Sequence, residues 1–135
     1  MIDRYTRPRM SAIWDLQHKY EIWLEVELQA CAAFERGGQI PRGTSARIRK
    51  KAKIDAARIA EIEKVTKHDV IAFLESLMDS VGPEHRFLHM GLTSSDIVDT
   101  SLAVQMTEAL DLILEDLDEL IAVLKKRAIE HRHTV

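Results

Sequence analysis

Apolar side chains recur at intervals of three and four residues along most of the chain, the period that returns side chains to one face of an α-helix. The five glycines and three prolines stand in a few short segments, so the long stretches between them contain no helix breaker. The pattern therefore predicts an all-α fold. Before residue 84 it predicts four helices, over about 11–37, 44–53, 55–64 and 70–81.

The ends of these helices follow from capping and breaking residues. The first helix is expected to begin near Ser11, whose hydroxyl can cap it, and to stop at Gly37 and Gly38. Residues 84–91 lie between two breakers and are too few for a stable α-helix. We expect an irregular connection there.

The longest element is expected to begin at Thr93, which suits an N-cap by residue type, with Asp96 three residues later in the capping-box position. Apolar residues then follow at spacings of four, four and three, an 11-residue period that keeps such a stripe nearly straight along the helix. The members of this apolar stripe are Val98, Leu102, Met106, Ala109, Ile113, Leu117, Leu120, Leu124 and Ala128.

This long helix is larger than the rest of the chain can cover. A helix from Ser94 to His133 would be about 60 Å long. We therefore expect other chains or further residues to cover the apolar stripe. No glycine or proline closes the helix before Val135, so the chain is expected to be a truncated part of a longer protein.

Composition narrows the class of protein. A chain of 135 residues, 46% hydrophobic and 30% charged, is typical of one soluble globular domain or of one domain and the beginning of another. The net charge of −3 provides no overall field for nucleic acid or an anionic membrane, so any anion site must be local. A single cysteine, Cys31, favours a buried thiol and a reducing, cytoplasmic setting, and no secretion signal or membrane span is visible.

Histidines are the first candidates for chemistry. His68, His85 and His89 fall within 22 residues, but no cysteine pair, His-Glu-x-x-His motif or acidic loop accompanies them. We therefore expect no metal site. Four histidines are more simply interpreted as residues on the surface or at a helix cap. These are His85 itself, His18, His131 and His133.

The segment Lys67-His68-Asp69 places a histidine at the start of a helix, where the dipole favours a neutral imidazole. Such a ring can both donate and accept a proton. The alternative is that Asp69 caps the helix and His68 points to water.

Three hydroxyl residues and the helix start after Gly91 form a second candidate anion site, since free backbone N–H groups there can bind a carboxylate or a phosphate. Thr93 and Ser94 are its first members, and the alternative is capping without a ligand. Arg4 and Tyr5, with Arg7 and Arg9, could add a phosphate clamp, and the alternative is a basic segment that is only solvated.

Three motifs together resemble the adenylosuccinate lyase family of the fumarase/aspartase superfamily, and the resemblance covers the whole chain as its amino-terminal portion. The motifs are Met1-Ile2-Asp3-Arg4-Tyr5, Lys67-His68-Asp69-Val70 and the segment from His89 to Thr100, His-Met-Gly-Leu-Thr-Ser-Ser-Asp-Ile-Val-Asp-Thr. The Ser-Ser-Asp portion distinguishes this family from fumarases, aspartases and argininosuccinate lyases, which carry other segments there.

The resemblance implies a β-elimination that releases fumarate from adenylosuccinate, giving AMP, and from the succinylated aminoimidazole carboxamide ribotide of purine biosynthesis. It implies no cofactor. His68 is implied as catalytic, either as an acid or only as a binding and orienting residue. The implied substrate-binding residues are Arg4, Tyr5, Lys67, His68, Asp69, His89, Thr93 and Ser94.

The resemblance also implies an architecture. Residues 1–93 would form a small amino-terminal helical domain, and residues 94–135 the first long helix of a central helical bundle that assembles a homotetramer. A later histidine in a Thr-His-Gly segment and a serine on a flexible loop would lie beyond Val135. The rival hypothesis is a non-enzymatic helical module whose apolar stripe serves oligomerisation and whose histidines are caps.

Overall fold

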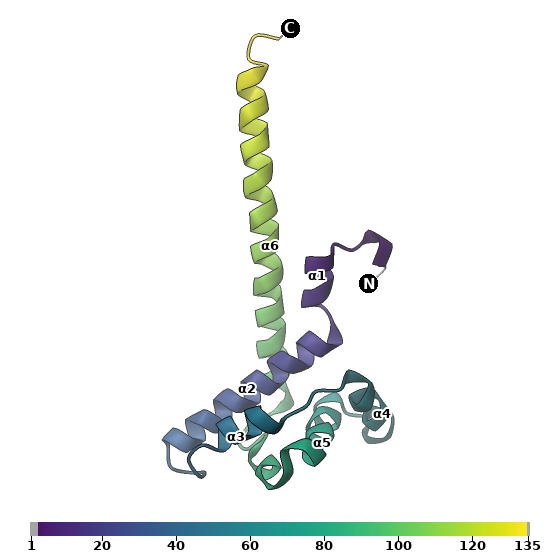
Figure 1. Cartoon of the computed structure of the whole chain (residues 1–135), viewed down its shortest axis with the longest axis vertical. Helices are drawn as coiled ribbons and strands as arrows, with labels where there is room; N and C mark the ends of the chain where they lie inside the picture. Colours follow the sequence, from purple (N-terminus) through teal and green to yellow (C-terminus); the bar gives the residue numbers. More distant parts are fainter. Residues whose placement is uncertain (1–2, 135) are drawn as a thin grey trace.

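Every regular element in the computed structural model, which describes residues 3–134, is a helix (Figure 1). The prediction of an all-α fold is therefore confirmed. In chain order the elements are the 3-10 helix η1 (Asp3–Tyr5), α1 (Pro8–Ile13), α2 (Leu16–Arg36), α3 (Thr44–Lys51), α4 (Ala56–Thr66), α5 (Asp69–Val81), the 3-10 helix η2 (Gly82–Phe87) and α6 (Ser94–Glu130).

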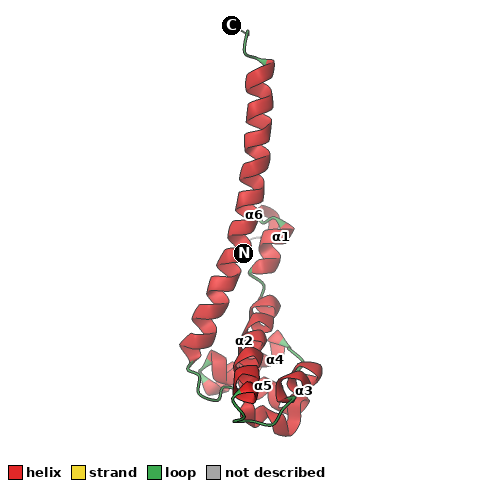
Figure 2. Cartoon of the chain, turned by 90° about the vertical axis from the view of Figure 1, so that its left-hand side faces the viewer, coloured by secondary structure: helices red, strands yellow, loops and turns green. Residues whose placement is uncertain are grey.

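The helices α2 to α5 pack into one unit, and α6 rises out of this unit as a long rod (Figure 1). Figure 2, turned by 90°, shows the same rod and places α1 beside it, so that α1 packs against α6 as well as against α2. The carboxyl end of the described chain lies at the far tip of the rod.

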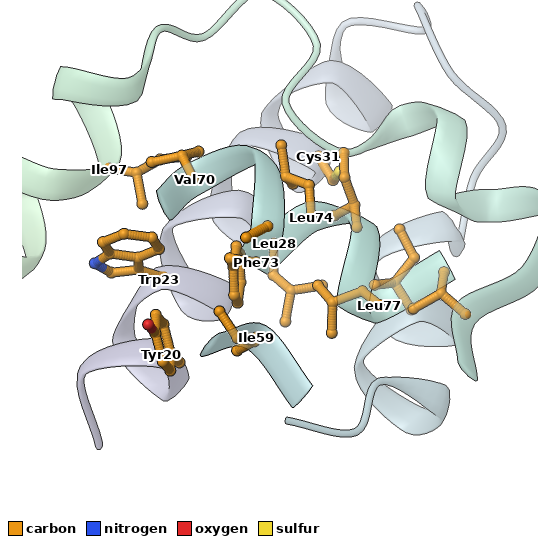
Figure 3. Close-up of a cluster of buried hydrophobic side chains, with 14 of the residues drawn as sticks. Tyr20, Trp23, Leu28, Cys31, Ile59, Val70, Phe73, Leu74, Leu77 and Ile97 are labelled. Carbon is orange, nitrogen blue, oxygen red and sulfur yellow. The ribbon is translucent and has the colours of Figure 1, made fainter. Parts of the chain in front are cut away.

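The core is centred on three aromatic side chains from α2 and α5. Tyr20, Trp23 and Phe73 have ring centroids 5.3 to 5.9 Å apart, and Trp23 and Phe73 are fully buried. Figure 3 shows aliphatic side chains around them, including Val70 of α5 next to Ile97 of α6. The first turns of α5 and α6 are thereby packed together by apolar burial, the main driving force for such contacts.

The prediction of a single first helix over about 11–37 is wrong. The chain forms α1 and α2 with a break at Trp14 and Asp15, and the Asp15 carboxylate accepts the N–H of Gln17 (2.8 Å) to cap α2. Ser11 lies inside α1 and not at its cap, because Pro8 begins that helix at a position where a missing N–H costs nothing. The apolar period continues across the break, so it concealed the Asp15 cap.

The remaining short elements follow the predicted order. The helices α3, α4 and α5 lie where the pattern places them, with Asp55 as the cap of α4. The segment 84–91 is not wholly irregular, because η2 extends through Phe87. Two histidines expected at the surface are half-buried and bonded: His85 Nε2 lies 2.8 Å from the carbonyl oxygen of Leu74, and His18 Nε2 lies 2.7 Å from Glu108.

The long helix begins with the predicted capping box of Thr93 and Asp96 and has 37 residues, about 55 Å, ending at Glu130 instead of His133. Its buried face is not the apolar stripe, because only one stripe residue, Ala109, is on it. That face consists of Ile97, Ser101, Gln105 and Ala109. Most of the stripe is exposed, with Leu102 at 46% and Leu124 at 58%, so the expectation that this chain leaves it uncovered is confirmed.

Candidate functional site

Two helix starts and one tight turn meet at the junction of α5 and α6. The contact between Val70 and Ile97 in Figure 3 lies within about one helical turn of both His68 and Thr93. The turn that carries His89 precedes α6 directly and is closed by a hydrogen bond from the N–H of Leu92 to the carbonyl oxygen of His89 (3.4 Å). Residues 67–69 thus lie at the start of α5 and residues 93–94 at the start of α6, close to the Val70–Ile97 pair, and His89 lies in the turn before α6.

The start of α5 is formed by a reversal of the chain at Lys67, which ends α4 in the left-handed region (φ 55°). This turn places His68 at the N-cap, where its Nδ1 accepts the N–H of Ile71 at 3.4 Å. Asp69 instead accepts the neighbouring N–H of Val70 (2.7 Å). The cap is therefore His68 and not Asp69, the reverse of the simple capping alternative.

This geometry has a chemical consequence for His68. A ring whose Nδ1 accepts a hydrogen bond carries its proton on Nε2, because a neutral imidazole has one donor and one acceptor nitrogen. The side chain is 46% exposed, so Nε2–H can reach a ligand outside the helix. In that tautomer His68 presents an N–H donor at the surface while its other nitrogen caps the helix.

His89 is held by a carboxylate from α2 that is completely buried. Glu27 accepts the backbone N–H of His89 (2.6 Å) through Oε2, and its Oε1 lies 2.8 Å from His89 Nδ1. His89 adopts a left-handed backbone (φ 59°), which is uncommon for a residue other than glycine. Two hydrogen bonds to one carboxylate therefore fix a strained residue at the site.

The loop before α6 depends on a glycine. Gly91 has φ +70°, and a Cβ at this position would lie 3.1 Å from the ring of Phe34. After it, the carboxylate of Asp96 accepts the N–H of Thr93 (2.8 Å), so the capping box satisfies this helix start. Ser94 follows as the first residue of α6 and is half-buried. Because Thr93 and Asp96 already form the cap, the Ser94 hydroxyl is not needed to cap α6.

Arg4 and Tyr5 are not brought to this junction. The guanidinium of Arg4 lies 4.8 Å from the ring centroid of Tyr5, and Tyr5 is 75% exposed. The segment that follows them is tied to α6 by the ion pair of Arg7 with Asp116. Asp116 lies 22 residues after Ser94, about 33 Å along the helix, and Figure 1 places η1 level with the middle of α6.

Neither the thiol nor the acidic groups in residues 3–134 suggest other chemistry. Burial raises the pKa of Cys31 to about 11, and the carboxylates of Glu27 and Glu35 add to the shift, so this thiol is a poor nucleophile. No group of three potential metal ligands occurs in the described part of the chain. Within the same residues, no helix combines the length and hydropathy that a bilayer crossing requires.

The one site residue that the sequence interpretation missed is Glu27. A signal was present, because Glu27 lies four residues after Trp23 and four before Cys31 and so occupies the buried face of α2. A charged residue in a buried stripe is rare unless it is paired. Its partner, however, lies 62 positions away in sequence, and no local pattern connects the two.

Comparison with known proteins gives consistent matches. The chain matches the lyase family over residues 3–135. It is 45% identical over its whole length to the adenylosuccinate lyase of Bacillus subtilis (strain 168) and 47% identical to that of Synechocystis sp.. The chain spans 31% of the length of each of these two curated relatives.

Two solved structures share the fold. A fumarate lyase from Mesorhizobium sp. BNC1 matches 91% of the chain with a TM-score of 0.83 and 25% identity, and the match covers 30% of that protein. The 3-carboxy-cis,cis-muconate lactonizing enzyme of Pseudomonas putida matches 96% of the chain with a TM-score of 0.86 and 28% identity, and covers 32% of that protein.

Proposed function

The chain belongs to the lyase family, and from this premise we propose that it is the amino-terminal part of an adenylosuccinate lyase. The whole protein would eliminate fumarate from adenylosuccinate to give AMP, and from the succinylated ribotide earlier in purine biosynthesis. The observation that carries the proposal is identity of 45% to 47% with adenylosuccinate lyases along the entire chain, which includes the junction of α5 and α6.

The chemistry of the junction agrees with this reaction. A β-elimination needs a base to remove a proton next to a carboxylate, donors that stabilise the resulting dianion, and an acid for the departing nitrogen. Adenylosuccinate carries two carboxylates and a phosphate, and helix starts with exposed donors suit such anions. We assign Lys67, His68 and Asp69 at α5, and Thr93 and Ser94 at α6, to substrate binding, with His89 between them.

The role of His68 follows from its cap. Since Nδ1 accepts the N–H of Ile71, a neutral ring carries its proton on Nε2 and is arranged to donate and not to abstract. We propose that His68 binds and orients the substrate through Nε2–H, or protonates the leaving nitrogen. The base would come from the part of the protein beyond residue 135. The reaction as proposed requires no cofactor and no metal.

The position of Arg4 and Tyr5 favours a site shared between copies of the protein. They belong to η1, which lies level with the middle of α6, whereas Ser94 begins α6 and His68 caps α5. If all of these residues bind substrate, a second copy must supply one set. The exposed apolar stripe supplies a surface for that association. We propose a homotetramer in the cytoplasm, with residues 1–93 as its small domain and 94–135 as the start of the central bundle.

The direct test is an assay of the whole protein with adenylosuccinate, following fumarate release. We expect turnover, and we expect adenylosuccinate to raise the melting temperature of a catalytically inactive variant, because a ligand that binds only the folded state stabilises it. A correctly folded whole protein that neither releases fumarate nor gains thermal stability would favour the helical oligomerisation module instead.

A further inference from the structure

Glu27 is the charged residue whose burial most needs an explanation. It is 0% exposed, and the other buried polar residues in the described chain, Thr44, Ser101 and Gln105, carry no charge. A carboxylate removed from water is stable only when it is paired and hydrogen-bonded. Both of its oxygens are used for one residue, His89, through the backbone N–H and through Nδ1.

A second glutamate of the same helix shows what a purely structural carboxylate does. Glu35 accepts the backbone N–H groups of Gly43 (2.8 Å) and Ser45 at the start of α3, and these hydrogen bonds lower its pKa. It contacts no imidazole in these interactions. Glu27 differs because one of its oxygens is directed at the ring of His89, whose side chain is 21% exposed. That ring can meet both the buried carboxylate and a ligand.

The backbone of His89 points to the same conclusion. A non-glycine residue in the left-handed region persists only where its surroundings hold it there, and such residues gather at functional sites. The bond from its N–H to Glu27 at 2.6 Å fixes this backbone, and the contact at Nδ1 fixes the ring. One buried side chain thus sets both the position and the rotation of the imidazole.

We propose that Glu27 is a positioning residue of the active site, which acts through His89; the proposal rests on the proposed lyase function. The carboxylate holds His89 with Nδ1–H directed into the protein, so that Nε2 is the ring nitrogen presented to the substrate. A buried carboxylate on one ring nitrogen commonly sets the tautomer and orientation of a functional histidine. With Nδ1 held by the carboxylate, Nε2 is the ring atom that forms a hydrogen bond with a polar group of adenylosuccinate.

The test is Glu27→Gln in the whole protein. The amide can accept only one of the two hydrogen bonds, and it removes the negative charge that pairs with the ring. We expect KM for adenylosuccinate to rise by about tenfold or more, the effect of losing one charge-assisted hydrogen bond, while kcat changes by less than about threefold. The matched control is Glu35→Gln, the same substitution on the same helix, which should leave KM unchanged.

A double-mutant cycle separates positioning from general structural support. If Glu27 acts through His89, then Glu27→Gln should raise KM no further in a His89→Ala background, because the ring it holds is gone. Additive effects of the two substitutions would overturn the proposal, as would a wild-type KM in folded Glu27→Gln. Absence of lyase activity in the wild-type protein would instead refute the proposed function.

A measurement on the wild-type protein does not depend on the folding of a variant or on activity. Nitrogen NMR of protein labelled with 15N-histidine distinguishes the protonated ring nitrogens, and the His89 signals are assigned by their loss in His89→Ala. We expect a proton on Nδ1 in the ligand-free protein. A His89 ring protonated at Nε2 alone would overturn the proposal even if the kinetic effects were as expected.

Discussion

Ser94→Ala, compared with Thr93→Ala, tests whether the start of α6 binds an anion or is only capped. The two residues are adjacent but have different partners in the structure. Thr93 belongs to a capping box, in which its N–H is bonded to Asp96 at 2.8 Å, whereas Ser94 has no part in that box. If the Ser94 hydroxyl serves a ligand, the two substitutions should affect different quantities.

The magnitudes follow from these partners. Loss of the Thr93 side chain removes a cap, which costs about 1 kcal/mol of folding free energy. Loss of the Ser94 hydroxyl leaves the capping box intact, so the stability cost should be about 0.5 kcal/mol or less, as for a residue outside the cap. Loss of one hydrogen bond to a charged ligand group should cost about 1.5–3 kcal/mol of binding free energy, which is roughly a 10- to 150-fold increase in Kd.

The assay has two parts. Isothermal titration of the whole protein with adenylosuccinate, in a catalytically inactive background, gives Kd, and urea unfolding gives the free energy of unfolding. We expect Ser94→Ala to change Kd and Thr93→Ala to change mainly stability. An unchanged Kd for Ser94→Ala would refute the reasoning and remove Ser94 from the proposed site, because its hydroxyl would then have no ligand.

Three further predictions follow from the same geometry. The purified 135-residue chain should show no fumarate release, because the proposed histidine and serine beyond residue 135 would be missing; turnover above background would contradict this. His68→Gln in the whole protein should lower kcat strongly and stability by only about 1 kcal/mol or less, since its cap bond to Ile71 is long at 3.4 Å; comparable losses of kcat and unfolding free energy would indicate a cap alone. Cys31 should react with a thiol reagent at pH 8 far more slowly in the native protein than in urea, because it is 1% exposed and its pKa is raised to about 11; equal rates would contradict its burial.

The raised pKa of Cys31 also fixes the direction of a stability change with pH. The unfolded thiol ionises near its ordinary value of 9.0, while the folded thiol stays neutral until about 11. Between these values the unfolded state releases a proton that the folded state retains, so folding stability falls as pH rises through this window. Well below pH 9 the thiol is neutral in both states and contributes no pH dependence.

Local features of the fold could be predicted from the sequence because their causes are local. The caps at Asp55 and at Thr93 with Asp96 are decided within a few residues, as is the helix start at His68. The apolar period predicted helices but not their breaks, since a cap such as Asp15 interrupts the backbone without interrupting the period. The same limit explains why the stripe on α6 did not identify the face that packs on α2.

The buried face of α6 shows this limit clearly. Ser101 accepts the indole N–H of Trp23 at 2.8 Å, and the amide of Gln105 donates to the carbonyl oxygen of Ile13 at 2.7 Å. Polar residues are therefore buried there because partners far away in sequence satisfy them, while the leucines of the stripe remain exposed. Hydrophobicity alone would predict that the leucine stripe is buried and that the face with Ser101 and Gln105 is exposed. That prediction is wrong for this chain, because hydrophobicity does not account for hydrogen-bond partners on another helix.

The candidate site depends both on local capping residues and on contacts between residues far apart in sequence. The sequence could therefore locate only part of it. The helix starts at His68 and Thr93 are local and were predicted, but their meeting depends on burial of Val70 against Ile97, a contact between elements. The hold of Glu27 on His89 and the separation of Arg4 from Ser94 along the rod of α6 are equally non-local. If one substrate binds both Arg4 and Ser94, their separation along the 37-residue helix prevents one copy from closing the site alone. Association through the exposed stripe would then be a requirement of the chemistry and not only a source of stability.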